Sequence, residues 1–250
     1  MIRATLALLV AALPAPAFAQ DGPRLAFTVG AGAAVVPEYF GSDQTDVGPS
    51  FSFDAGFVSL GGLSFGDEDP TDVETGLGFR GSFRYVSARQ GGPFEGPGRL
   101  AGEVDAAIEV GGGVRYAQSW YEAFAVARVG VGGHDAVVGE LGMDLIARPT
   151  DRLRLTAGPR LFYGTDDYAG TYFSTADDTD AAGPLFEAGG GLLTSGVELG
   201  ASYGLSDRWG LQATARYDRF QGDAGESPIT EEDDQVSATI ELTRRFDFRF

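Results

Sequence analysis

His134 is the only histidine in this 250-residue chain, and it lies beside Asp135 in the segment GGHDA. A histidine next to an acid can act as a general base when a serine nucleophile is within reach. No nucleophile elbow, the strand-to-helix turn that presents a catalytic serine, accompanies this pair. The alternative is a tight hairpin in which glycine supplies positive φ and the polar pair faces water. We favour the hairpin, and we predict no catalytic residue and no enzyme.

Two acidic runs, residues 177–180 (DDTD) and 231–234 (EEDD), are candidates for cation binding. Calcium prefers several oxygen ligands, but neither run has the spacing or the glycine of an EF-hand. A single histidine and no cysteine argue against an ordinary zinc site. We interpret both runs as solvated loop charges, which divalent cations could bridge to lipopolysaccharide, and we predict neither a metal nor a cofactor.

Aromatic and glycine clusters supply the remaining candidates for binding. In DDYAGTYF, residues 166–173, the rings could bind a ligand at an outer mouth or fold over that mouth as a lid. The glycine triplets at 111–113 and 189–191 have no following helix, so they are not phosphate loops. We expect them at bends or at close approaches between strands.

The charge balance narrows the function classes. The chain has 36 acidic residues against 18 basic ones and a formal net charge of −18. Phosphate binding needs a basic face, so a nucleic-acid partner is not expected. Cysteine is absent, so no disulfide can hold the fold together.

The first residues predict export. A positive charge at Arg3, an apolar run over residues 4–12 and the sequence Ala17-Phe18-Ala19 are typical of a signal peptide. The apolar run is shorter than the roughly 17–25 residues that span a bilayer. We therefore expect a signal peptide over residues 1–19 and a mature chain of residues 20–250.

A period of two recurs along most of this mature chain, which predicts an all-β fold. No segment of helical length has a convincing 3.6-residue period. The alternation is clearest at the end of the chain, where a single face holds Val236, Ala238, Ile240, Leu242, Phe246, Phe248 and Phe250. Eleven segments show the pattern: 25–35, 51–57, 60–65, 77–85, 104–116, 121–131, 137–147, 153–163, 197–205, 209–217 and 236–250.

The faces of these strands favour a transmembrane, up-and-down, antiparallel β-barrel over a soluble sandwich. A sandwich buries large side chains between its sheets, whereas these apolar faces mix alanine and glycine with aromatic residues. Charges on the other face could pair across strands and plug a narrow lumen. They are Arg80, Arg84, Asp105, Glu109, Arg115, Glu122, Arg128, Glu140, Asp144 and Arg216.

Bacterial single-chain barrels have an even number of strands, so eleven segments require an adjustment. We predict twelve strands, the last one supplied by residues 185–193; the alternative is ten, with residues 51–65 forming one bulged strand. The short connections around Thr150 and Asp207 are expected on the periplasmic side and the long acidic ones, 164–183 and 222–234, outside the cell. A strand at 185–193 conflicts with this sidedness.

Several motifs in order resemble the MltA-interacting protein (MipA/OmpV) family of outer-membrane proteins. They are PEYFGSD at 37–43, GGHDAVVGELG at 132–142, DDYAGTYF at 166–173, YGLSDRW at 203–209 and GDAGESPITEEDDQVSATIELTRRF at 222–246. The resemblance runs from about residue 27 to the end. Two features depart from the family: a Gly- and Pro-rich segment at 90–102 and an extended C-terminus.

The resemblance implies a non-enzymatic outer-membrane protein that acts as a scaffold between a murein transglycosylase and a penicillin-binding protein in cell-wall maintenance. A narrow solute channel is the first alternative, and a lipid-modifying enzyme that uses His134 is the second. The terminal Phe246, Phe248 and Phe250 are expected on the lipid-facing side of the last strand, where the barrel assembly machinery would recognise them.

Overall fold

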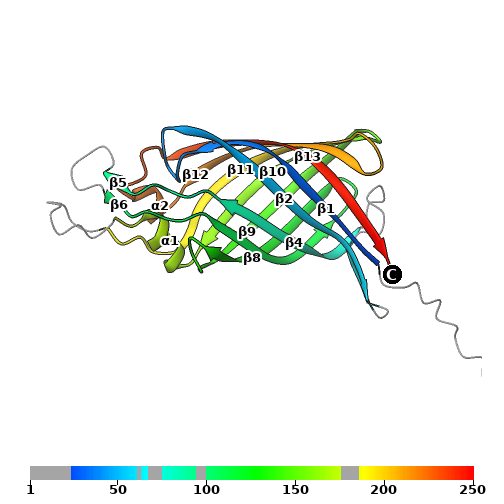
Figure 1. Ribbon diagram of the computed structural model, residues 1–250, viewed down its shortest axis with the longest axis horizontal. Helices are drawn as coiled ribbons and strands as arrows, with labels where there is room; N and C mark the ends of the chain where they lie inside the picture. Colours follow the sequence, from blue (N-terminus) through cyan, green and yellow to red (C-terminus); the bar gives the residue numbers. More distant parts are fainter. Residues whose placement is uncertain (1–23, 61–62, 67–74, 94–99, 176–185) are drawn as a thin grey trace, which may run out of the picture.

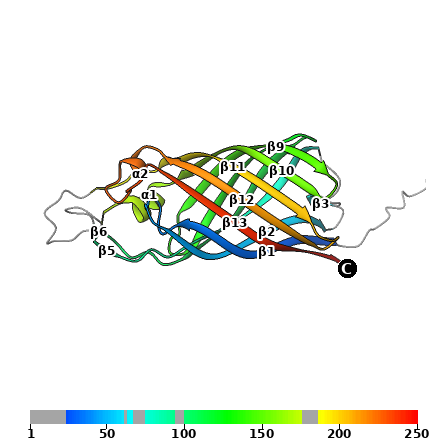
Figure 2. The same cartoon turned by 90° about the horizontal axis from the view of Figure 1, so that it is seen from above.

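The computed structural model describes residues 24–60, 63–66, 75–93, 100–175 and 186–250. Most of them form one antiparallel sheet that curls around an interior (Figures 1 and 2). The expected signal peptide, residues 1–19, lies outside the described residues. Within the described ranges, no helix is long and apolar enough to cross a membrane.

Ten strands of at least eleven residues build the wall of the molecule. They are β1 (Arg24–Pro37), β2 (Thr45–Leu60), β4 (Gly76–Val86), β7 (Ala107–Ala117), β8 (Tyr121–Gly132), β9 (Val137–Thr150), β10 (Leu153–Gly164), β11 (Gly191–Gly204), β12 (Trp209–Phe220) and β13 (Asp234–Arg249). The shorter elements are β3 (Leu63–Gly66), β5 (Gly92–Pro93), β6 (Leu100–Ala101) and the helices α1 (Asp166–Phe173) and α2 (Asp223–Glu226). All eleven segments that were predicted from the period of two contribute to strands.

The strands are hydrogen-bonded in the order β3-β2-β1-β13-β12-β11-β10-β9-β8-β7-β4. The first and last long strands, β2 and β4, lie beside each other (Figure 1). Among the described residues no hydrogen-bonded ladder joins them, so the prediction of a fully paired barrel is confirmed only as a curled antiparallel sheet. At its end, β2 pairs instead with β3, from Phe57 opposite Gly66 to Leu60 opposite Leu63.

Ten long strands are described, and two segments differ from the predicted strands. Residues 186–190 are not in a strand, and Gly191–Leu193 form the start of β11. The backbone N–H groups of Phe186 and Ala188 donate instead to the hydroxyls of Thr175 and Ser174, which follow α1. Residues 51–65 are not one bulged strand either, because β2 and β3 turn back on each other as a hairpin.

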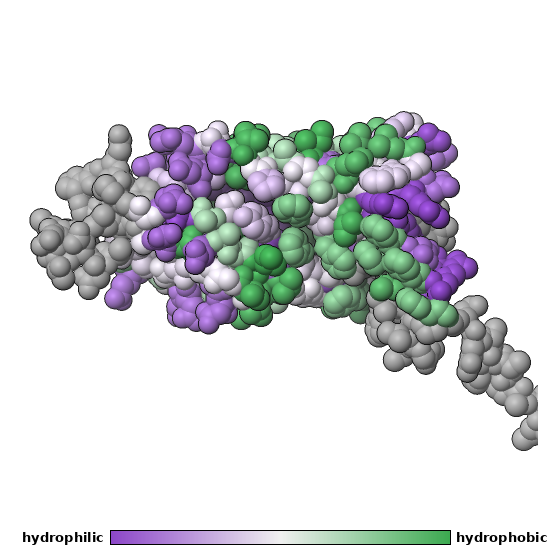
Figure 3. Space-filling model, viewed as in Figure 1, coloured by the Kyte–Doolittle hydropathy of each residue, from purple (hydrophilic) through white to green (hydrophobic). Residues whose placement is uncertain are grey.

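Side chains alternate between the two faces of the wall as predicted. On β7, Ile108, Val110 and Val114 are exposed, while Glu109 between them is fully buried. On β13, Ile240 is exposed and the neighbouring Glu241 is buried. Hydrophobic side chains gather over the middle of the visible face, and hydrophilic ones gather toward its two ends (Figure 3). The outside of the sheet is therefore apolar and the inside is polar.

The two ends of the molecule differ. The start of β1, the end of β13 and the short connections after β7, β9 and β11 lie at one end, which we call the turn end (Figure 1). Both helices and the hairpin at residues 133–136 lie at the other, which we call the helix end. Without a strand at 185–193, the short connections around Thr150 and Asp207 lie together at the turn end, and the helices of the two long acidic connections lie at the helix end.

Glycine permits close strand contact where the sequence predicted it. A Cβ atom at Gly111 or Gly113 of β7 would lie 1.9 Å from a carbonyl oxygen of β8, on Ala127 or Ala125 respectively. Such a contact is impossible for any other residue, so this triplet marks a close approach between strands. Gly191, at the end of the second triplet, has a positive φ of 134° where β11 begins.

Candidate functional site

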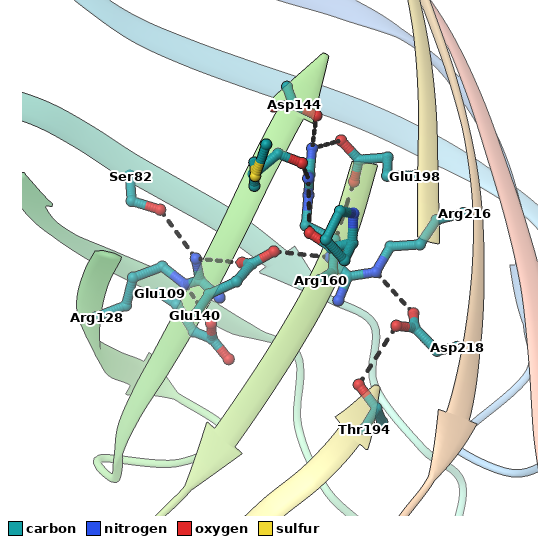
Figure 4. A network of polar contacts seen from close by, with 12 residues as sticks. Ser82, Glu109, Arg128, Glu140, Asp144, Arg160, Thr194, Glu198, Arg216 and Asp218 are labelled. Atoms are coloured by element: carbon teal, nitrogen blue, oxygen red, sulfur yellow. Dashed lines mark hydrogen bonds and ion pairs between the residues drawn. The ribbon is translucent and has the colours of Figure 1, made fainter. Parts of the chain in front are cut away.

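A chain of ion pairs crosses the interior of the sheet (Figure 4). Arg128 of β8 donates to Glu109 of β7 and to Glu140 of β9, each at 3.0 Å. The other carboxylate oxygen of Glu140 accepts from Arg216 of β12 at 2.8 Å. Because β9 and β12 are not neighbours in the sheet, this bond spans the interior.

The network continues through a second arginine. Arg160 of β10 donates to Asp144 of β9 at 2.7 Å and to Glu198 of β11 at 2.9 Å. Arg216 lies 3.8 Å from Glu198 and binds Asp218 at 2.7 Å, which joins the two halves of the network. Nearer the turn end, Arg80 and Arg115 both approach Glu122, and Arg80 stacks over the ring of Phe124 at 4.1 Å.

These contacts confirm the predicted cross-strand pairing, with one exception. Asp105 is exposed in the connection before β7 and faces water instead of the network. Arg160, Glu198 and Asp218 were not named among the pairing charges, although each lies on the polar face of β10, β11 or β12. Their alternation with apolar neighbours could have identified them.

Buried charges are costly unless each finds partners, so the network has structural consequences. Glu109 is fully buried, and it accepts from both Arg84 and Arg128. Removal of one partner from such a pair typically costs about 3–5 kcal/mol, because the other charge stays behind in a poorly solvating interior. The arrangement places fixed charges from β4 and from each of the strands β7 to β12 in the interior.

Helix α1 closes the helix end. Its side chains Tyr168, Ala169, Tyr172 and Phe173 are almost completely buried against residues of the wall, and we call this group the cap. The ring of Tyr168 makes a T-shaped contact with Phe162 of β10 at 5.6 Å between ring centres. The packing supports the predicted lid over the interior, and the rings of Tyr168, Tyr172 and Phe173 also line a cavity beneath it.

Arg89 fixes the end of α1. It is 5% exposed, and its guanidinium donates to the carbonyl of Tyr172 at 2.7 Å and to those of Thr171 and Gly102 at 3.1 Å each. The last carbonyls of a helix have no partner within the helix and carry partial negative charge. Arg89 satisfies two of them. Burial lowers the pKa of this guanidinium, although nearby tyrosines oppose the shift.

His134 lies beneath the cap. The predicted hairpin is present, but His134 does not face water as expected. Gly132 has a positive φ of 105° and Asp135 is exposed, as expected, but His134 is 6% exposed. Its ring meets Tyr168 and Tyr172 edge-on, at 5.1 and 5.6 Å between ring centres. Its Nε2 lies 3.4 Å from a Glu109 oxygen, and burial lowers its pKa.

Nothing in this setting resembles a catalytic triad. Among the described residues neither ring nitrogen of His134 has a hydrogen-bond partner. The letters GLSFG at residues 62–66 match the Gly-x-Ser-x-Gly pattern of serine hydrolases. Ser64, however, lies in β3, which pairs back on β2 as a hairpin, whereas a nucleophile elbow leads from a strand into a helix.

Only the second of the two acidic runs lies in the part of the chain that the structure describes. Residues 177–180 lie outside the described residues. In the second run, the backbone N–H groups of Glu231 and Glu232 both donate to the carbonyl of Gly41. No group of three potential metal ligands occurs among the described residues.

The C-terminal aromatic residues form a ladder on the outside of β13. Phe246 and Phe248 stack at 6.3 Å and 6° between ring planes, and Phe248 stacks on Phe250 at 6.4 Å. Phe27 of β1 extends the ladder at 5.2 Å from Phe246. Between these rings, Asp247 pairs with Arg24 at 2.7 Å. The ladder and the ion pair join the first and last strands of the described chain, β1 and β13, which are neighbours in the sheet.

The curled antiparallel sheet has apolar side chains on its outer face and ion-paired charges on its inner face. This distribution is the reverse of that in a water-soluble β-protein, whose apolar side chains face inward. The family model of "MltA-interacting protein MipA" matches residues 29–246. The chain therefore belongs to this family, as its motifs predicted.

Solved outer-membrane proteins show a weak overall likeness. Ail of Yersinia pestis is 10% identical over 91% of this chain and 100% of its own, with a TM-score of 0.27. OprG of Pseudomonas aeruginosa is 12% identical over 91% and 98%, with a TM-score of 0.25. A Pseudomonas aeruginosa FadL homologue is 8% identical over 92% and 91%, with a TM-score of 0.35. Scores this low transfer no function. No curated protein matches the chain significantly.

Proposed function

We propose that the chain is a non-enzymatic outer-membrane β-barrel, exported with cleavage of residues 1–19, that serves as a scaffold for murein enzymes. The proposed membrane location is supported by the wall of the molecule, which is apolar on the outside and charged on the inside. Exposed Leu, Val and Ile side chains suit lipid, and the paired charges suit a closed interior. The same chain in water would leave a large apolar surface exposed.

The scaffold part rests on the family and on the two different ends. With the termini and short turns in the periplasm, the turn end would face the cell wall and its enzymes. Trp120, in the turn after β7, is 59% exposed and stacks edge-on against Tyr121 at 4.5 Å. An exposed tryptophan beside a second ring is the kind of anchor that dominates protein interfaces. The expected partners are a murein transglycosylase and a penicillin-binding protein.

Affinity capture from solubilised envelopes tests this proposal. The wild-type protein is expected to enrich a murein transglycosylase over an unrelated barrel of similar size. Trp120→Ala should reduce the capture, and Asp135→Ala, an exposed change at the helix end, should not. Equal recovery with the unrelated barrel would remove the scaffold function and leave the membrane location untouched.

The interior network weighs against the two alternatives. A solute channel needs an open path, but the ion-pair network and the cap occupy the interior. In planar bilayers we expect no steady conductance from correctly folded protein; regular single-channel steps would favour the channel. A lipid-modifying enzyme would need His134 at the surface, whereas the ring is buried beneath two tyrosines. Lipid A should be unchanged after overexpression.

A further inference from the structure

We propose that the helix end contains a binding pocket for a small, uncharged aromatic molecule that carries a hydroxyl or carbonyl group. A cavity of about 270 Å³ lies between the cap and the inner wall. Its wall includes the rings of Phe40, Phe162, Tyr168, Tyr172, Phe173 and Phe220. Small-molecule sites commonly combine apolar and aromatic walls with a few polar groups that fix the orientation of the ligand.

The rings are held in place before any ligand arrives. Phe40 meets Tyr172 edge-on at 5.1 Å and lies 6.0 Å from Phe173. Tyr168 is held by Arg84, and the end of α1 is held by Arg89. Aromatic rings pair favourably in offset or edge-to-face arrangements, which a ligand ring could continue. A preformed pocket also avoids the entropic cost of ordering its walls upon binding.

Three residues of this cavity wall each carry a buried polar atom without a hydrogen-bond partner among the described residues. These atoms are Arg84 Nε, Tyr172 Oη and Gln235 Oε1. A buried polar group without a hydrogen bond is costly, and native structures contain few of them. One donor, one acceptor and one hydroxyl that can do both would match a ligand hydroxyl or carbonyl. This set of atoms explains why the ligand should carry one polar group on an apolar ring.

The charge around the cavity disfavours ions of either sign. A second cavity of about 430 Å³ adjoins the first and shares six wall residues with it, among them Tyr39 and Arg89; we call it the vestibule. Carboxylates of Glu38, Asp46 and Glu231 line this vestibule and repel anions. Inside, Arg84, Arg89 and Arg216 line the wall together with Glu38 and Asp218. Arg84 and Arg216 are already paired with carboxylates, so the wall has no strong excess of either sign. The preferred ligand is therefore neutral.

Three probes with the same ring test the proposal: 2-phenylethanol, phenylacetate and 2-phenylethylamine. Saturation-transfer NMR titrations would use the full mature protein in lipid nanodiscs. We expect saturable binding of 2-phenylethanol and at least tenfold weaker binding of the two ions. Absence of saturable binding, or equal binding of all three probes, would overturn the proposal.

Variants locate the binding. Ser237→Phe fills the cavity from β13 and should abolish the saturable signal, whereas Ser202→Phe, on the inner face of β11 outside the cavity wall, should leave it intact. Tyr172→Phe removes one hydroxyl only, and the loss of one neutral hydrogen bond should weaken binding about fivefold. If Ser237→Phe does not fold, the affinity of the Tyr172→Phe variant decides whether the probe binds in the cavity. Identical binding by wild type and Tyr172→Phe, together with binding by a folded Ser237→Phe variant, would place the probe elsewhere, in lipid or on the surface.

Discussion

Arg84 of β4 donates a 2.6 Å hydrogen bond to the hydroxyl of Tyr168 on α1. The same Nη2 atom lies 2.7 Å from Glu109, and the guanidinium stacks over Phe162 at 4.3 Å. One side chain thus connects the interior ion pairs with the cap. Because Tyr168 is fully buried, its hydroxyl has no access to water as a substitute partner.

Tyr168→Phe is therefore expected to destabilise the protein without changing its shape. A hydrogen bond to a charged group contributes about 1.5–3 kcal/mol, and the free energy of unfolding should fall by that amount. Urea unfolding in lipid vesicles, followed by tryptophan fluorescence, measures the change. Tyr163→Phe is the matched control, because Tyr163 lies on the outer face of β10. Equal stability of the two variants would contradict a structural role for the Arg84–Tyr168 bond.

Glu140→Gln tests the bond that spans the interior. Glu140 accepts from Arg128 and Arg216, so the neutral amide leaves the buried Arg128 and the half-buried Arg216 short of one negative charge. We expect a loss of about 3–5 kcal/mol, as for other broken buried pairs. Thermal unfolding of the purified protein gives the measurement. Asp135→Asn removes an exposed charge at the helix end and should change stability by less than about 0.5 kcal/mol.

His134 should make stability depend on pH. Burial lowers its pKa in the folded state, so the unfolded chain binds the proton more tightly. Its contribution is complete above the unfolded value of about 6.5 and is lost as the pH falls below it. His134→Gln should flatten the curve of unfolding free energy between about pH 7 and pH 5. A variant curve parallel to that of the wild type would show that other groups cause any slope.

Local pattern predicted the wall but not the contacts across it. Alternation placed Glu109 and Arg216 on the polar face, because side-chain direction follows from strand geometry alone. It could not show that Arg216 reaches Glu140, since that bond depends on how far the whole sheet curls. Arg216 and Glu140 lie far apart in the chain, so no short stretch of sequence can predict their contact.

The helix end was the hardest part to predict for the same reason. His134 stands between glycines and an aspartate, which is a typical exposed turn. Its burial is caused by α1, which folds over it from more than thirty residues later in the chain. The false strand at 185–193 has a similar origin. Hydroxyls next to α1 satisfy the backbone there in place of a neighbouring strand.

Deletion of Phe250 is expected to reduce assembly in the outer membrane while export continues. Phe250 is 77% exposed, so it contributes little to packing beyond its contact with Phe248, and its loss should hardly affect the folded wall. A signal read by the assembly machinery would instead depend on the terminal ring itself. Heat-modifiable protein in outer-membrane fractions measures assembly, and signal-peptide cleavage measures export. Arg249→Ala, which changes the neighbouring residue and keeps the ring, should assemble normally. Normal assembly of the deletion variant would contradict recognition of the terminal phenylalanine.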